Sequence, residues 1–210
     1  MSDEIDLEKI EQRAVAAYYE DGLLDIFEGG YLLFMGLRAL NDFAYRHILI
    51  WIILPSLGIL LYNEAKKLVT YPRVGYIKFT KERRARIARD SIIVMFVAAF
   101  VTLTGLFTGM GTPESAPWGV LLLNKYNLLF QGGVLASIFL LLSRVMGVTR
   151  LRLYSIISLI VYLAGYIYLD SPFIVSSQTL GTPLAIIGVA MVGIGVLHLH
   201  RFIGRYPKEA

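Results

Sequence analysis

KKLVTYPRVGYIKFTKERRARIAR, residues 66–89, holds nine of the chain's twenty Lys and Arg residues in under an eighth of its length. Apolar stretches lie on both sides of it, and each is close to the ~20 residues that a helix needs to cross a bilayer. Lys and Arg beside such spans collect on the cytoplasmic face of a membrane. The stretch therefore predicts a membrane protein in which this loop lies on the cytoplasmic side.

The composition of the whole chain agrees with this prediction. Of 210 residues, 56% are hydrophobic and 17% are charged, whereas soluble domains have about 45–50% apolar and about 25% charged residues. The chain has no cysteine, which excludes disulfides, thiolate metal sites and a catalytic thiol. The net charge of +4 lies beside apolar spans, so we expect anionic lipid headgroups as its partner and no nucleic acid.

We therefore expect an all-α integral membrane protein, a bundle of six transmembrane helices. The first 21 residues have apolar side chains at helical spacing and are predicted to form an interfacial amphipathic helix. A membrane domain follows over residues 22–203, with a basic cytoplasmic loop at 65–90 and a cytoplasmic tail at 204–210. The spans are expected at about 22–40, 47–64, 91–109, 118–142, 153–169 and 182–203.

The distribution of positive charge gives the orientation of this bundle. Six spans place both termini on one side, and seventeen Lys and Arg residues fall on that side. Only Arg38, Arg46 and Lys125 fall on or near the other side. The positive-inside rule then predicts that both termini are cytoplasmic, in a cell membrane.

Three acids stand out at the start of the first span. Asp21, Asp25 and Glu28 are spaced i, i+4, i+7 and form one stripe of a helix. An ionised carboxylate inside the bilayer costs about 2.5–3.5 kcal/mol on insertion scales unless it is paired. Three readings stay open: a structural ion pair, a proton- or cation-binding site, or a span that starts later and leaves the acids at headgroup level.

The candidate cations for such a pair lie on the same predicted side of the membrane. They are Arg73, Lys78 and Arg201. Tyr71–Phe79 is expected to be extended after the Tyr71-Pro72 step, and we predict that this segment folds back toward the acids.

Two further spans carry polar stripes. They are predicted either to form interhelical hydrogen bonds or to line a polar route together with the acids. The residues are Asn124, Asn127 and Gln131 in the fourth span, and Ser155, Ser158 and Tyr162 in the fifth.

Small residues mark helix faces that allow close approach. Glycines recur at seven-residue steps at 22, 29 and 36, and small residues share one face in the third span and in the sixth at 181, 185, 188 and 195. These faces predict helix packing, with a homo-oligomer or membrane partner as the alternative. The basic helix after Thr80 is predicted to contact anionic headgroups, through Lys81, Arg83, Arg84, Arg86 and Arg89.

No pattern in the chain points to an enzyme or a cofactor. His47 is far along the chain from His198 and His200, and these last two are two residues apart and so lie on different helix faces. No pairing of axial haem ligands is visible, and neither a metalloprotease nor a hydrolase motif occurs. We expect no metal, no cofactor and no catalytic residue.

Three short segments resemble a group of prokaryotic multi-pass membrane proteins of uncharacterised function. They are YPRVGYIKF at residues 71–79, DGLLDI at 21–26 and RFIGRYP at 201–207. The resemblance covers the two ends and one loop, and it implies a bacterial or archaeal cytoplasmic-membrane protein. It implies no activity, cofactor or catalytic residue.

Three classes of function follow from these observations. The first is a small transporter or ion- or proton-linked permeation pathway that uses the acids of the first span. The second is a membrane scaffold or accessory subunit that docks partners through the glycine faces and the 66–89 stretch. The third, with least support, is an intramembrane enzyme.

Overall fold

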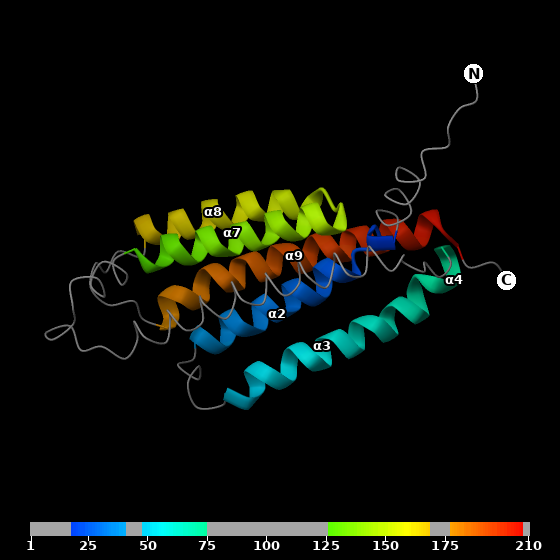
Figure 1. The fold of residues 1–210 in the computed structure, drawn as a ribbon, viewed down its shortest axis with the longest axis horizontal. Coiled ribbons are helices and arrows are strands. Elements are labelled where there is room, and N and C mark those ends of the chain that lie inside the picture. Colours follow the sequence, from blue (N-terminus) through cyan, green and yellow to red (C-terminus); the bar gives the residue numbers. More distant parts are fainter. Residues whose placement is uncertain (1–17, 41–47, 75–125, 169–176, 208–210) are drawn as a thin grey trace, which may run out of the picture.

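The computed structural model describes residues 18–40, 48–74, 126–168 and 177–207, and these ranges are helical apart from short turns (Figure 1). Residues 1–17 of the expected interfacial helix, the third span and the basic helix at 81–89 lie outside them, as do Lys78 and Asn124. The helices are α2 (Leu23–Leu40), α3 (Ile48–Val69), α4 (Tyr71–Val74), α7 (Asn127–Met146), α8 (Arg150–Tyr168) and α9 (Ser177–Arg205).

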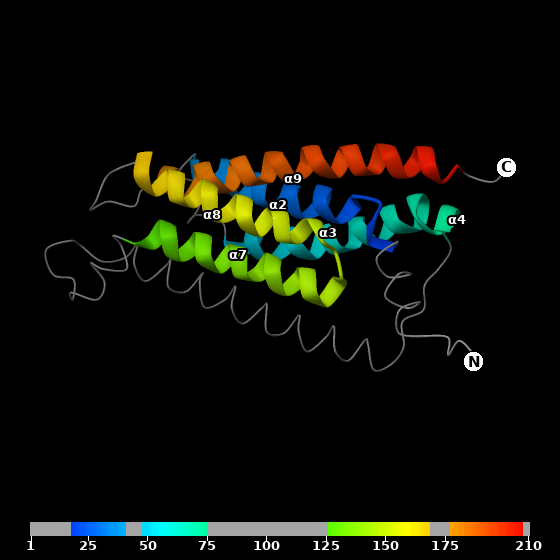
Figure 2. The same cartoon turned by 90° about the horizontal axis from the view of Figure 1, so that it is seen from above.

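The long helices lie roughly side by side as a bundle. α2 packs most extensively on α9, α7 packs on α8, α8 also contacts α9, and α3 lies beside α2 (Figures 1 and 2). One end of the bundle gathers the start of α2, the end of α3 with α4, the α7–α8 turn and the end of α9. We call this the basic end, because every described Lys and Arg except Arg38 lies there.

Three of these helices are long and apolar enough to cross a membrane. They are Asn127–Met146, Arg150–Tyr168 and the Gly181–Arg205 part of α9. This agrees with an all-α membrane protein. The α2 helix matches the expected first span within one residue and carries the charged residues Asp25, Glu28 and Arg38.

Several helices extend beyond the expected spans, mostly at the basic end. The second and fourth spans were expected to end at 64 and 142, and the helices α3 and α7 continue to Val69 and Met146. The α8 helix begins at Arg150, before the expected start of the fifth span at 153. The charged residues Lys66 and Arg150 fit into helices because each has an acidic partner inside the protein. The α7 helix ends where Gly147 adopts a left-handed conformation, φ 71°, and donates to the Ser143 carbonyl at 2.9 Å.

Two prolines lie inside helices. The α9 helix begins at Ser177, five residues before the expected start of the sixth span at 182, and includes Pro183 in its second turn. Proline has no N–H to donate, so this position lacks one intrahelical hydrogen bond. Tyr71, which was expected to be extended, begins the one-turn helix α4. Pro72 lies in the first turn, where its missing N–H would have had no helical partner.

Three reciprocal glycine pairs bring α2 and α9 into backbone contact. Gly22 faces Gly195, Gly29 faces Gly188 and Gly36 faces Gly181, each glycine lying against the carbonyl oxygen of its partner. The pairs follow the two antiparallel helices over fourteen residues, about 21 Å of helix length. The predicted close approach along the glycine faces is confirmed for these two helices, and the two faces fill each other.

This contact leaves no room for a methyl group, which makes Gly29→Ala a direct test. A Cβ on Gly29 would lie 2.6 Å from the Met191 Cβ and 2.8 Å from the Val192 nitrogen, on backbone that cannot move alone. We expect Gly29→Ala to lower the free energy of unfolding by about 1–3 kcal/mol, measured by denaturant titration in mixed micelles.

The matched control is the neighbouring glycine. A Cβ on Gly30 would meet nothing within 4 Å, so Gly30→Ala should be neutral or stabilise the helix by up to about 1 kcal/mol. Equal effects of the two substitutions would show that α2 and α9 do not make this contact.

Candidate functional site

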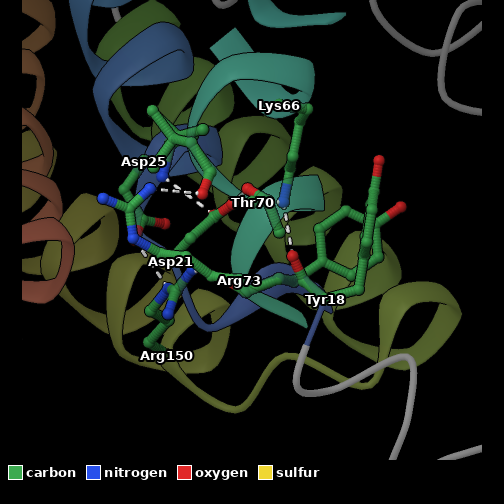
Figure 3. A network of polar contacts seen from close by, with 10 residues as sticks. Tyr18, Asp21, Asp25, Lys66, Thr70, Arg73 and Arg150 are labelled. Atoms are coloured by element: carbon green, nitrogen blue, oxygen red, sulfur yellow. Dashed lines mark hydrogen bonds and ion pairs between the residues drawn. The ribbon is translucent and has the colours of Figure 1, made fainter. Parts of the chain in front are cut away.

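Asp21 is the centre of a buried polar network at the basic end (Figure 3). Its Oδ1 accepts a hydrogen bond from the Leu23 backbone N–H at 3.1 Å, an Asx-type turn that leads the chain into α2. Its Oδ2 lies 2.6 Å from the Lys66 Nζ on α3 and also accepts from the Thr70 hydroxyl. Both oxygens of this carboxylate are therefore hydrogen-bonded within the protein.

Lys66 is as fully buried as its partner. Its ammonium also donates to the Tyr18 carbonyl. Three tyrosine rings surround it, with Nζ-to-centroid distances of 3.9 Å for Tyr18, 5.3 Å for Tyr19 and 5.5 Å for Tyr62. Aromatic faces attract a cation. Burial nevertheless lowers the pKa of the Lys66 ammonium from its ordinary value, against the opposing effect of the Asp21 carboxylate.

A second ion pair joins α2 to α8. The Nε of Arg150 lies 2.6 Å from the Oδ2 of Asp25, whose side chain is fully buried, without the alignment of a hydrogen bond. The Arg150 guanidinium also donates to the Tyr19 carbonyl. Lys66 and Arg150 thus each bind one carboxylate and one backbone carbonyl of residues 18–25, and they tie this segment to α3 and α8.

The Asp21–Lys66 pair can be tested by removing the cation. Lys66→Met leaves Asp21 buried without its ion-pair partner, and breaking a buried pair from one side costs about 3–5 kcal/mol. We expect the free energy of unfolding in mixed micelles to fall by that amount, and Asp21→Asn combined with Lys66→Met to recover part of it.

The neighbouring lysine supplies the control for this substitution. Lys67 pairs with Glu64 at 2.6 Å, but both side chains are exposed, so Lys67→Met should leave unfolding unchanged. If Lys66→Met has as little effect as Lys67→Met, the buried pair does not stabilise the fold.

The third acid of the stripe is different. The Oε2 of Glu28 is buried and has no hydrogen-bond partner among the described residues. The charged groups that act on it are Asp25 and Arg150. The described part of the chain also leaves both Asp25 oxygens without a hydrogen bond. Two carboxyl groups one helical turn apart therefore retain unused acceptor capacity in a buried position.

A hydroxyl group lies in the same surroundings. Tyr154, one turn after Arg150 on α8, is fully buried. Its hydroxyl has no partner within the described ranges, and the charged groups around it are Asp25, Arg150 and Glu28. The Tyr62 hydroxyl on α3 is likewise buried and unpartnered there. A hydroxyl can both donate and accept, so the site offers donors as well as acceptors.

The cations beside Asp21 and Asp25 are not those named from the sequence. Arg73 donates to the Val69 carbonyl at 2.7 Å, within its own part of the chain, and Arg201 is exposed. Lys78 lies outside the described residues. The partners are Lys66 and Arg150, because α3 and α8 extend further toward the basic end than predicted and carry these residues into the protein.

The predicted polar stripes are only partly placed at this site. In α8, Ser155, Ser158 and Tyr162 are buried, in line with Tyr154. Ser158 donates to the Tyr154 carbonyl at 2.8 Å, inside its own helix, and Tyr162 packs on Gly132 of α7. Asn127 is buried at the start of α7 and Gln131 is half-buried one turn later, near the opposite end of the bundle from the acids (Figure 1).

Sequence reasoning did not single out Lys66, Thr70, Arg150 or Tyr154 as site residues. One signal was available for α8. Arg150 and Tyr154 extend the Ser158–Tyr162 stripe by two helical turns at a spacing of four, so a charged residue heads a polar face that points into the bundle. For Lys66 no such signal exists, because a lysine directly after an apolar span is typical of the charges that orient a membrane protein.

No protein-family model matches the chain, and neither a curated protein nor a solved structure is found to be similar to it. The resemblance of its short segments to prokaryotic membrane proteins therefore stays an expectation, and function has to be argued from the site.

Proposed function

We propose that the chain is a six-span protein of the cell membrane, with both termini in the cytoplasm. Three apolar helices and the gathering of cations at one end of the bundle support this arrangement. The basic end then faces the cytoplasm, where the 81–89 segment contacts anionic headgroups. The acids of α2 lie just inside this end.

The topology can be tested by labelling, because the chain has no cysteine of its own. We expect Lys67→Cys to react with a membrane-impermeant maleimide only after the cells are permeabilised. Ser115→Cys, in the expected loop between the third and fourth spans, should react in intact cells. The reverse pattern would contradict the orientation, and labelling of both in intact cells would contradict the six-span count.

We propose further that this protein is a small transporter or permeation pathway. Protons or cations either drive the transport or are themselves transported, and they bind at Asp25 and Glu28. One observation carries the proposal: Glu28, Asp25 and Tyr154 hold buried oxygens without a hydrogen bond among the described residues, although Asp25 is ion-paired with Arg150. A carboxylate that serves structure alone resembles Asp21, whose two oxygens accept from Leu23, Lys66 and Thr70. Unused buried acceptors cost free energy, and a ligand that enters the site removes this cost.

The position of the site supports this class over the others. It lies at the basic end of the bundle, where ion pairs bring the charged residues of α2, α3 and α8 together. The scaffold alternative relied on free glycine faces, but those of α2 and α9 are filled by each other. Intramembrane ionisable groups with incomplete pairing are typical of ion and proton pathways.

The test is transport by the purified chain in sealed vesicles. With an imposed pH or cation gradient, we expect the wild-type chain to dissipate the gradient. Glu28→Gln and Asp25→Asn should reduce this flux to the level of empty vesicles, because each removes an ionisable oxygen from the site. The readout is a pH- or cation-sensitive dye inside the vesicles.

Two controls make this result decisive. Glu64→Gln removes an exposed acid that pairs only with Lys67 on the surface and should retain full flux. Circular dichroism and unfolding in micelles establish that the neutral variants fold. If folded Glu28→Gln and Asp25→Asn chains conduct as the wild type does, these acids are not the transport site.

A further inference from the structure

The charges around Glu28 do not balance. In the described part of the chain, two cations, Lys66 and Arg150, form ion pairs within a group of three buried or half-buried carboxylates, Asp21, Asp25 and Glu28. Arg73 is also half-buried, but it donates to the Val69 carbonyl and pairs with none of these three acids. Each cation is already within 2.6 Å of a carboxylate other than Glu28. With all side chains ionised, the cluster carries one unmatched negative charge, and Glu28 is the group without a cation of its own.

An unmatched charge in a buried position is strongly unfavourable, so the cluster favours whatever supplies a single positive charge. The buried oxygens without a hydrogen bond there are the two of Asp25, one of which is ion-paired with Arg150, the Oε2 of Glu28 and the Tyr154 hydroxyl. Ca²⁺ and Mg²⁺ need six or more oxygen ligands, and no group of three metal-ligating side chains occurs in the described ranges. One proton needs a single oxygen, and the Glu28 Oε2 is one.

We infer that Glu28 holds one exchangeable proton, taken from water at the basic end. When the proton binds, an O–H bond forms at the Glu28 carboxyl and the charge of the cluster goes from minus one to zero. Arg150 keeps Asp25 ionised, so the proton resides on Glu28. This inference deepens the proposed function, since it names the proton as the transported or driving species.

The titratable and charged groups that face this site come from every helix packed around it. On α2 they are Asp21 and Asp25, on α3 Tyr62 and Lys66, and on α8 Arg150 and Tyr154. On α9 the half-buried titratable group is His198, whose charged neighbours are Arg150, Arg201 and Glu20. Among these groups, Arg150 alone is a cation that acts on both Asp25 and Glu28, so its charge sets how many protons the acids hold.

Charge balance then predicts how many carboxyl groups are protonated in each variant. The wild type should hold one, and Glu28→Gln none. Asp25→Asn should also hold none, because Arg150 becomes available to balance Glu28. Arg150→Gln should hold two, and Asp25→Asn combined with Arg150→Gln should return to one. The double variant restores the proton while lacking both members of the ion pair.

The count can be measured by infrared difference spectroscopy of the full chain in lipid vesicles during a pH titration. A protonated carboxyl gives a C=O stretching band that a carboxylate lacks, and its area reports the number of protonated groups. We expect Tyr154→Phe to keep the band and its area, because this hydroxyl adds no charge to the cluster. Glu64→Gln should change neither area nor frequency.

Two results would overturn the inference. The first is a band of wild-type area in folded Glu28→Gln. The second is absence of the band in the double variant when the wild type shows it, which is decisive even if Arg150→Gln alone fails to fold. A band that follows the predicted counts in vesicles without flux supports the proton site and contradicts only the transport function.

Discussion

The fold at the basic end depends on the cost of removing carboxylates from water. Asp21 and Asp25 are fully buried, and each is matched by a cation from another helix, Lys66 of α3 and Arg150 of α8. The two cations also bind the backbone carbonyls of Tyr18 and Tyr19. Residues 18–25 are thereby joined to two distant parts of the chain, since Lys66 is 45 residues after Asp21 and Arg150 is 125 residues after Asp25. Both α3 and α8 are fixed against the start of α2.

Two different kinds of contact hold α2 on its two sides. Toward α9 the contact is a close fit in which each paired glycine lies against the backbone of the other helix. Toward α3 and α8 the contact is made by charges whose partners must be present. Glu28 lies on the same helix as both contacts but takes part in no ion pair within the described ranges. A helix held on two sides thus carries one acid without an ion-pair partner among the described residues.

Much of α2 could be predicted from sequence, and much of its surroundings could not. The apolar run after Gly22 predicts the helix within a residue, and the cost of charge in such a run singles out Asp25 and Glu28. The seven-residue glycine spacing predicts a close contact. It does not say which helix makes that contact, because several spans have small-residue faces. Lys66 and Arg150 were interpreted only as cations that orient the chain in the membrane. Their positions in the sequence do not show which helices lie next to each other.

The glycine pairs have a consequence for the register of α2 and α9. Because glycines recur every seven residues on both helices, a slide of α9 by seven residues, about 10 Å, would again place Gly29 against Gly195 and Gly36 against Gly188. The glycines therefore set how closely the helices approach but permit more than one axial position. The choice among these positions falls to the large side chains between the glycines, Ile187 and Met191, which are fully buried in one core cluster with Leu24 of α2. Closeness and alignment in this helix pair are thus encoded by separate residues.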